Sequence, residues 1–253
     1  MSGKTVIVTG GSRGLGRATA CILARMGANV VLAARSENAL QEAADEINRS
    51  GGQALAVSGD LRQQNTCQKV VEEAVTRFKS IDGLINNAGI LGPLARIADA
   101  EPSAWTENWE INVLSPVMIT KIALPHLRAR KGRVIHISTG MAVKPVAGTS
   151  AYNVAKAGLN MFSATLAIEE PLVTTITLRP GGVDTDVQAT LRAEGAGVMD
   201  PEVFKKYSTR ELLPPEIPGR AVATLALYAP YDWSGRFISY DDEDVQTLVK
   251  KYK

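Results

Sequence analysis

The segment Thr9-Gly10-Gly11-Ser12-Arg13-Gly14-Leu15-Gly16 constrains the fold of this chain most strongly. It follows a short β-branched run, 5–9, and it opens a stretch in which apolar residues recur with helical spacing as far as Met26. A glycine loop between a strand and a helix turns backbone N–H groups and the helix N-terminus toward an anion such as a phosphate. The order predicts the first unit of a parallel α/β sheet, with an anion site at the carboxyl end of its first strand.

The rest of the chain continues the alternation of apolar strands and helices. Further strands are predicted at 29–34, 53–58, 82–86, 133–138, 173–178 and 236–239, and helices at 14–26, 36–49, 63–78, 103–130, 150–169, 215–228 and 245–253. Unbroken apolar strands that alternate with helices indicate a parallel sheet covered on both faces. We therefore predict a single doubly wound, Rossmann-like α/β domain over residues 1–253. Residues 184–214 break the alternation and are predicted to form a small inserted lobe.

Charge, cysteine spacing and hydropathy exclude several classes of function. The chain has 28 Lys and Arg against 26 Asp and Glu, which gives no long-range field for nucleic acid or an anionic membrane. Cys21 and Cys67 lack C-x-x-C or metal-ligand spacing. The N-terminus lacks the pattern of a signal peptide, and no apolar run approaches the length of a membrane span. We expect a cytoplasmic protein with no metal site and no nucleic-acid or membrane partner.

Tyr152 and Lys156 lie four residues apart in the helix predicted at 150–169. Side chains at this spacing share one face of a helix, so the phenol and the ammonium would point into the same space. A phenol is a poor acid at neutral pH, but a nearby cation favours the phenolate and lowers its pKa. The pair is a candidate proton donor, although the spacing alone is also common on solvated helix surfaces.

Three motifs together resemble the short-chain dehydrogenase/reductase family over nearly the whole chain: Thr9-Gly-x-x-x-Gly-x-Gly, Asn86-Asn87-Ala88-Gly89 and Tyr152-x-x-x-Lys156. The resemblance implies a nicotinamide dinucleotide bound across the carboxyl ends of the strands, and reversible hydride transfer to a carbonyl carbon. It implies catalytic roles for Asn112, Tyr152, Lys156 and a hydroxyl thirteen residues before the tyrosine. The run Asp184–Gln188 is similar to the branch with sepiapterin and benzil reductases.

The catalytic hydroxyl is a choice between two neighbours. Counting back from Tyr152 reaches Thr139, where the family has serine, and Ser138 lies immediately before it. Successive side chains of a strand point to opposite faces, so only one of the two can serve. We predict Thr139, whose hydroxyl donates and accepts as serine does while its methyl group narrows the pocket.

The end of the second predicted strand indicates which dinucleotide binds. An NAD enzyme usually carries an acid there to bind the ribose 2′-hydroxyl, and this chain has Ala34-Arg35 instead. Arg35, helped by Arg13, would bind a 2′-phosphate through charge-assisted hydrogen bonds, although both could be surface arginines. We therefore predict NADPH/NADP as the cofactor.

Further cofactor contacts are expected in loops at the same edge of the sheet. Asp60-Leu61 resembles the family's adenine-contacting pair, although Asp60 could instead cap the next helix. The segment 180–185 resembles the one that holds the nicotinamide end. The predicted cofactor-binding residues are Gly10, Ser12, Arg13, Gly14, Leu15, Gly16, Arg35, Asp60, Leu61, Asn87, Ala88, Gly89, Tyr152, Lys156, Pro180, Gly181, Val183 and Thr185.

The expected activity is NADPH-dependent reduction of a ketone, aldehyde or diketone to an alcohol. The lobe would roof an apolar substrate pocket, although some of its residues could only pack the lobe: Met141, Val143, Val187, Leu191, Met199, Phe204 and Tyr207. One alternative is a reductase of carrier-bound 3-ketoacyl thioesters, favoured by Lys205, Lys206 and Arg210 if these line the pocket mouth. Another is a catalytically silent NADPH-binding sensor or scaffold. The resemblance also implies a homodimer or homotetramer through helices 103–130 and 150–169.

Overall fold

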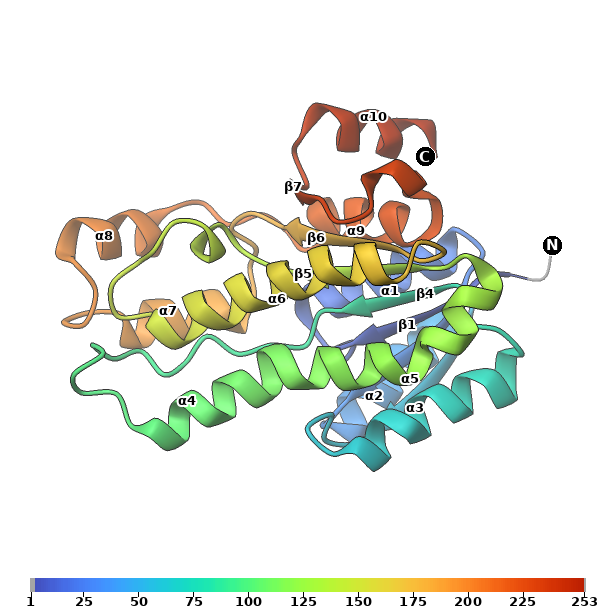
Figure 1. Cartoon of the computed structure of the whole chain (residues 1–253), viewed down its shortest axis with the longest axis horizontal. Coiled ribbons are helices and arrows are strands. Elements are labelled where there is room, and N and C mark those ends of the chain that lie inside the picture. The colour runs from blue at the N-terminus through green and yellow to red at the C-terminus, as the bar shows by residue number, and fades with distance from the viewer. Residues whose placement is uncertain (1–2, 253) are drawn as a thin grey trace.

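The computed structural model describes residues 3–252 (Figure 1). Its seven parallel strands form one sheet in the order β3-β2-β1-β4-β5-β6-β7. The strands are β1 (Thr5–Thr9), β2 (Asn29–Ala34), β3 (Gln53–Ser58), β4 (Gly83–Asn86), β5 (Arg133–Ile137), β6 (Thr174–Arg179) and β7 (Phe237–Ser239). The predicted doubly wound α/β fold is confirmed. Met1, Ser2 and Lys253, which the predicted domain 1–253 includes, lie outside the described residues.

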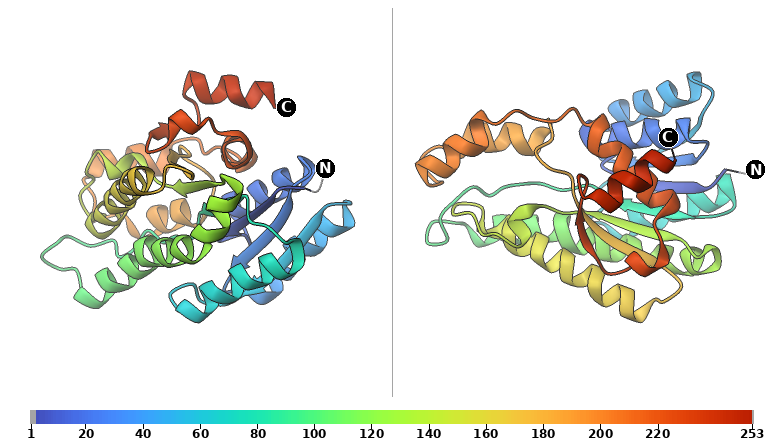
Figure 2. Two further views of the ribbon diagram at one scale, coloured as in Figure 1. Left: turned by 45° about the vertical axis from the view of Figure 1, so that its right-hand side comes forward. Right: turned by 90° about the horizontal axis from the view of Figure 1, so that it is seen from above.

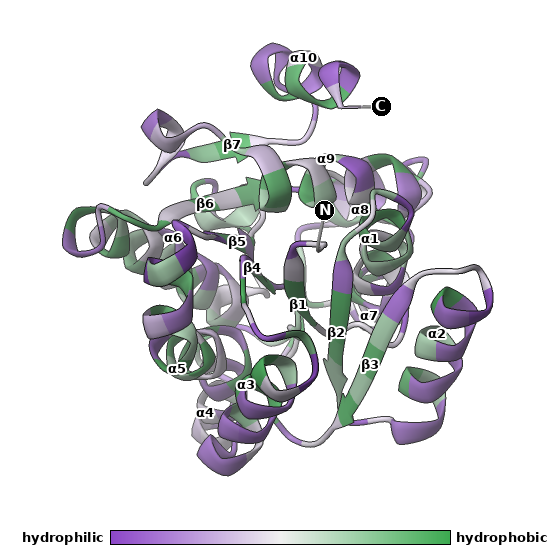
Figure 3. Cartoon of the chain, turned by 90° about the vertical axis from the view of Figure 1, so that its right-hand side faces the viewer, coloured by the Kyte–Doolittle hydropathy of each residue, from purple (hydrophilic) through white to green (hydrophobic). Residues whose placement is uncertain are grey.

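Helices cover both faces of this sheet. They are α1 (Gly14–Arg25), α2 (Glu37–Arg49), α3 (Gln64–Phe78), α4 (Pro102–Trp109), α5 (Ser115–Arg130), α6 (Ser150–Glu169), α7 (Asp186–Glu194), α8 (Pro201–Thr209), α9 (Glu216–Tyr228) and α10 (Glu243–Lys251). Helices α1, α2 and α9 lie over one face, and α3 and α5 over the other (Figure 3). The buried apolar side chains of each group pack on the face that it covers. None of these helices is both long enough and apolar enough to span a bilayer.

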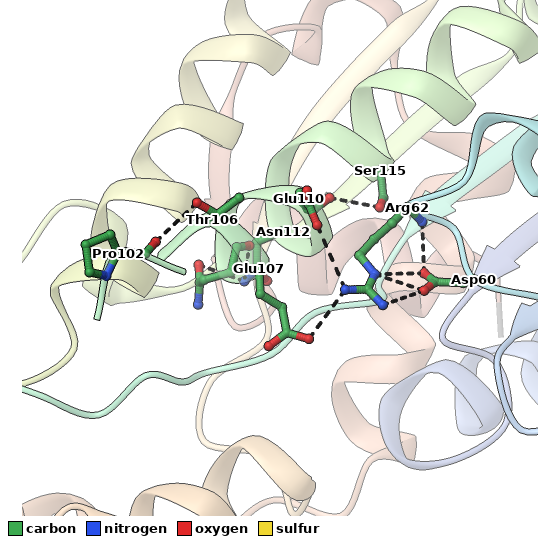
Figure 4. A network of polar contacts seen from close by, with 9 residues as sticks. Asp60, Arg62, Pro102, Thr106, Glu107, Glu110, Asn112 and Ser115 are labelled. Carbon is green, nitrogen blue, oxygen red and sulfur yellow. Dashed lines mark hydrogen bonds and ion pairs between the residues drawn. The ribbon is translucent and has the colours of Figure 1, made fainter. Parts of the chain in front are cut away.

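The helix predicted at 103–130 is interrupted between α4 and α5. Residues Glu110–Leu114 form a π-helical turn, and Ser115 Oγ donates to the Glu110 carbonyl oxygen five residues back at 2.9 Å (Figure 4). Pro116 lies in the first turn of α5 and Pro125 inside that helix, so neither proline lies within the π-helical turn. A π-helical turn within a helix often marks a functional site, and this one contains Asn112.

The loops that carry the predicted motifs leave the sheet along one edge. β1 pairs in parallel with β2 and β4, and β5 pairs in parallel with β4 and β6. The segments 10–16, 35–36, 87–89, 138–139 and 180–185 follow these strands and therefore lie side by side. The strand order reverses at β1, where a doubly wound sheet opens a crevice for ligands.

Helices α7 and α8 extend past the carboxyl ends of the strands, away from the side that holds both termini (Figure 2). Both fall within the predicted lobe, 184–214. Leu191 of α7 and Met199 join a buried cluster with Met141 and Tyr152, separate from the two clusters that flank the sheet. The lobe is thus anchored on the helix that carries the candidate tyrosine.

Gly16, in the first turn of α1, allows this helix to press on the glycine loop and on the end of β4. A Cβ atom at this position would collide with the Gly10 carbonyl oxygen and lie 2.6 Å from Asn87 Nδ2. Gly219 of α9, by contrast, has its nearest neighbours at 3.4 Å from the same added atom, which is ordinary contact. The two buried helical glycines therefore differ in whether they tolerate an added methyl group.

Gly16→Ala is expected to lower the free energy of unfolding by about 1–3 kcal/mol, because the loop or α1 must shift to admit the methyl group. Gly219→Ala is the matched control and should leave stability unchanged or raise it by up to about 1 kcal/mol, the usual helix gain of alanine over glycine. Urea unfolding of both variants measures the difference. Equal effects at the two positions would contradict the proposed role of Gly16 in packing.

Candidate active site

One cavity of about 1110 Å³ runs along the carboxyl edge of the sheet and brings together most of the predicted site residues. Gly16 and Asn112 do not line it. The predicted residues that do are Gly10, Ser12, Arg13, Gly14, Leu15, Arg35, Asp60, Leu61, Asn87, Ala88, Gly89, Thr139, Tyr152, Lys156, Pro180, Gly181, Val183 and Thr185. Residues from seven predicted segments distant in sequence therefore share one space.

The glycine loop forms a cradle that side chains would fill. Gly10 and Gly14 have φ of +65° and +52°, and a Cβ at Gly10 would lie 3.0 Å from Ala88 Cα, while one at Gly14 would lie 3.1 Å from Thr185 Cγ2. The N-cap residue of α1, Arg13, makes no side-chain capping bond, and the first turn contains no acid. The first N–H groups of the helix are thus available to an anion, and the cradle fits the pyrophosphate of a dinucleotide.

Arg35 and Arg13 do not meet as the sequence suggested. Arg35 is exposed directly after β2 and lines the cavity. Arg13 Nη2 instead forms a 2.5 Å ion pair with Asp186 Oδ2 at the start of α7, on the opposite wall of the cavity. Arg35 therefore places a positive charge at the end of β2, while Arg13 links the glycine loop to the lobe.

Asp60 does not cap α3, because the N-cap residue of that helix is Gln63. Its carboxylate accepts from Arg62, with Arg62 Nη2 at 2.6 Å from Oδ2, and this hydrogen bond holds the pKa of Asp60 below its usual range. Arg62 also lies 3.5 Å from Glu107 and 3.9 Å from Glu110, so it joins the loop after β3 to α4 and the π turn (Figure 4). Arg62 lines the cavity and was not predicted.

Tyr152 and Lys156 point into the cavity from one face of α6, and both are buried, with 7% and 4% of their surface exposed. Lys156 Nζ donates to the Ile137 carbonyl oxygen at 2.9 Å and lies 5.7 Å from the centre of the Tyr152 ring. Burial lowers the pKa of Lys156 to about 8 and raises the pKa of Tyr152 above its ordinary value. The predicted lowering of the tyrosine pKa was wrong, because loss of solvation outweighs the cation at this distance.

Asn112 lies behind the cavity wall rather than on it. The side chain is fully buried, and its Nδ2 donates to the Ile90 carbonyl oxygen at 2.9 Å and to Asn108 Oδ1 at 3.0 Å. Its Oδ1 accepts from Ile90 N at 3.3 Å. A Cβ at Gly89 would lie 2.6 Å from Asn112 Oδ1 and 3.4 Å from Lys156 Nζ, so the three residues converge. Asn112 thus fixes the loop after β4 beside the lysine.

Ser138 and Thr139 differ in where their hydroxyl groups are directed. Ser138 is 3% exposed and its Oγ donates to Asn160 Oδ1 at 2.6 Å, which engages its single proton. Thr139 Oγ1 accepts from Met141 N at 3.3 Å and so keeps its own proton for an acceptor in the cavity. The geometry favours Thr139 as the hydroxyl that meets a substrate.

The predicted apolar roof is only partly a cavity wall. Met141, Val187, Leu191 and Tyr207 line the cavity, whereas Met199 and Phe204 pack the lobe and Val143 is 67% exposed. Lys205 and Lys206 also lie outside the cavity, but Arg210 lines it.

Some cavity residues near the end of the chain are not among the predicted catalytic and cofactor-binding residues. Arg179, Ser239, Tyr240 and Asp241 line the cavity. Their position at the carboxyl ends of strands indicates a place at the cavity, because Arg179 ends β6 and the other three end or follow β7. Among residues 3–252, no group of three or more His, Cys, Asp or Glu is placed to hold a metal ion.

Comparison with known proteins places this geometry in context. A family model described as "short chain dehydrogenase" matches residues 4–196. The chain is 31% identical over 259 residues to a benzil reductase ((S)-benzoin forming) of Saccharomyces cerevisiae, with 95% of this chain and 97% of that protein covered.

Two crystal structures are similar to the whole fold. The short-chain dehydrogenase/reductase YIR035C of Saccharomyces cerevisiae matches with a TM-score of 0.92 and 33% identity, over 97% of this chain and 99% of that one. The KRED1-Pglu enzyme matches with a TM-score of 0.88 and 38% identity, over 92% and 99% of the two chains.

The two adjacent hydroxyl groups can be separated by mutation. Thr139→Val keeps the shape of the side chain but removes the proton donor, and we expect carbonyl reduction to fall by about 100-fold in kcat/KM. Ser138→Ala should keep kcat/KM within a few-fold and lose about 1 kcal/mol of unfolding free energy with its bond to Asn160. Steady-state rates and thermal unfolding of both variants test this, and the reverse order of activities would assign the role to Ser138.

Proposed function

The chain belongs to the short-chain dehydrogenase/reductase family, and from this premise we propose that it is an NADPH-dependent reductase of ketones, aldehydes or diketones. One observation carries the proposal. Tyr152, Lys156 and Thr139 line the same cavity as the glycine cradle and Arg35. A dinucleotide that spans the carboxyl ends of the strands would thus reach from a cationic end to a proton donor.

A dinucleotide held by the glycine cradle and Lys156 would supply a hydride to the carbonyl carbon, while Tyr152 and Thr139 act on the carbonyl oxygen. Both hydroxyl groups donate hydrogen bonds to this oxygen and stabilise the negative charge that grows on it, more than they stabilise the neutral carbonyl. Tyr152 then transfers its proton. Because burial raises the pKa of Tyr152, the phenol stays protonated at neutral pH, as a proton donor must be.

Lys156 and Asn112 support the tyrosine in different ways. The Lys156 ammonium, held by the Ile137 carbonyl, keeps further protons for the ribose of the dinucleotide and stabilises the phenolate that forms on Tyr152. Asn112 acts as a positioning residue, because its amide is bound to Ile90 and Asn108 and it touches the wall at Gly89. We assign it the task of keeping a path for protons behind Lys156.

The preference for NADPH rests on charge at the end of β2. Arg35 is an exposed guanidinium at the cavity, next to Ala34 in a place where an acid would bind the 2′-hydroxyl of NAD. A guanidinium binds phosphate through several charge-assisted hydrogen bonds.

An apolar carbonyl compound agrees best with the wall around the tyrosine. Met141, Val187, Leu191 and Tyr207 surround this end of the cavity. The similar yeast protein is named for reduction of benzil, an apolar diketone. Lys205 and Lys206 lie outside the cavity, which weakens the case for an acidic carrier protein and a thioester substrate.

We also propose that the chain forms a homodimer or homotetramer through α6 and the stretch 103–130, which holds α4, the π turn and α5. Val154, Met161 and Ile168 recur every seven residues along α6 and are 50%, 68% and 83% exposed. Trp109 and Leu114, at the adjoining π turn, are 40% and 42% exposed. A helix face of this kind is typical of a surface that packs on another helix.

A panel of ketones, aldehydes and diketones assayed with NADPH and with NADH tests the activity and the cofactor together. We expect carbonyl-dependent oxidation of NADPH, with a much higher KM for NADH. Arg35→Ala should raise the KM for NADPH by about 10- to 100-fold and leave that for NADH unchanged, since only NADPH carries the 2′-phosphate. Arg13→Ala should have the smaller effect, because Arg13 is paired with Asp186. A wild-type preference for NADH would contradict the assignment of Arg35.

The pH dependence of reduction follows from Lys156. Its pKa of about 8 means that the ammonium is charged below this pH and is lost as pH rises through it. We therefore expect kcat/KM to be constant between pH 6 and about 7.5 and to fall above about 8, since this profile reports groups of the free enzyme. Lys156→Arg should abolish the fall, whatever its rate, because arginine stays charged. A wild-type profile that stays flat to pH 10 would rule out a role for this charge.

A further inference from the structure

Arg210, at the end of α8, is a cation that lines the cavity without an acceptor among the described residues. None of the ion pairs or side-chain hydrogen bonds within residues 3–252 uses its guanidinium. Its Nε is buried with no partner. The surroundings disfavour its charge, because burial and the nearby Arg192 lower the pKa of Arg210 by more than Tyr207 raises it. A buried donor without an acceptor is destabilising, so this arrangement calls for a partner from outside the chain.

The position of Arg210 is set by two close contacts. Its guanidinium lies against Gly182, where an added Cβ would be 2.6 Å from Cζ, and its Cζ lies 5.0 Å from the centre of the Tyr207 ring. Gly182 belongs to the loop after β6, and Tyr207 packs in the same apolar cluster as Tyr152. Arg210 therefore contacts an aromatic side chain that packs against the cluster containing the proposed proton donor.

Arg179, the other arginine at this end of the cavity, is already neutralised. Its Nε donates to Ser239 Oγ at 3.1 Å, and its Nη2 lies 3.9 Å from Asp241 Oδ1. Of these two arginines, Arg210 is therefore the one whose guanidinium is available to a ligand in this part of the described chain.

We propose that Arg210 binds a carboxylate of the substrate, so that the preferred substrates are oxo acids whose ketone oxygen meets Tyr152 and Thr139. The planar guanidinium offers parallel N–H donors that match the two oxygens of a carboxylate. Met141, Val187, Leu191 and Tyr207 line the same cavity and offer apolar surface for the carbon chain between the two groups. The inference rests on the proposed carbonyl reductase activity and specifies its substrate class.

The test compares oxo acids with their methyl esters, which keep the ketone and remove the charge. A series with the ketone at carbon 2, 3, 4 or 5 varies the distance between the ketone and the carboxylate of the substrate. The wild-type enzyme should prefer at least one acid over its ester through a lower KM. Arg210→Gln should lower kcat/KM for that acid by about 10- to 100-fold, leave the ester within about twofold, and Arg210→Lys should restore part of the loss.

The control variant is Arg220→Gln, which removes an arginine of α9 that does not line the cavity. It should change neither the acid nor the ester. Thermal unfolding provides a second reading. Because no hydrogen bond or ion pair within residues 3–252 uses the Arg210 guanidinium, Arg210→Gln loses little more than the contact with the Tyr207 ring and should leave Tm nearly unchanged, whereas loss of a purely structural arginine would lower Tm.

Three results would overturn the inference. Acid and ester could lose activity together in Arg210→Gln, which would make Arg210 a packing residue of the lobe. The KM for NADPH could rise with every substrate, which would assign Arg210 to a phosphate of the cofactor. The wild-type enzyme could reduce esters and diketones with no preference for any acid, which would contradict this inference and leave the reductase activity standing. Absence of any carbonyl-dependent NADPH oxidation would instead refute the proposed function itself.

Discussion

The hydrogen bond from the buried Lys156 ammonium to the Ile137 carbonyl oxygen is the contact on which the site depends. It ties α6 to the carboxyl end of β5. Tyr152 lies one helical turn before Lys156, and Thr139 lies two residues after Ile137, so a single bond sets both hydroxyl groups around the same space. A buried ammonium without an acceptor would tend to give up its proton, and a carboxylate partner would cancel its charge. A backbone carbonyl satisfies the donor and leaves the charge to act on the phenol.

The features that the sequence predicted are those set by local patterns. The strands and helices depend on patterns among residues that are close together in sequence. The runs of β-branched residues and their alternation with helical patterns therefore predict the sheet and the helices. The glycine cradle also follows from the sequence, because Gly10 and Gly14 have positive φ, a local backbone conformation that glycine adopts readily. Tyr152 and Lys156 face one space because four residues make one helical turn. The order of strands in the sheet then brings these motifs to one edge.

The features that the sequence did not predict depend on contacts between distant residues. The ion pair of Arg13 with Asp186 and the links from Arg62 to Glu107 require the placement of α7 and α4. The pKa of Tyr152 rises because the lobe and the loops bury it, which no spacing along the chain reveals. Arg210 looked like one of several surface cations at the lobe, and only the fold separates it from its exposed neighbours. Local patterns thus define the cofactor end of the cavity, while tertiary packing defines the substrate end.

Hydride transfer to a carbonyl, with Tyr152 as the proton donor, is tested most directly by following deuterium from NADPH labelled at both C4 positions into a diketone such as benzil. The wild-type protein should form an alcohol with one deuterium on the former carbonyl carbon. Tyr152→Phe should still bind the labelled cofactor, measured by its fluorescence, but should form at most a trace of labelled alcohol. Labelled product at the wild-type rate in Tyr152→Phe, or no label in the product of the wild-type protein, would contradict this mechanism.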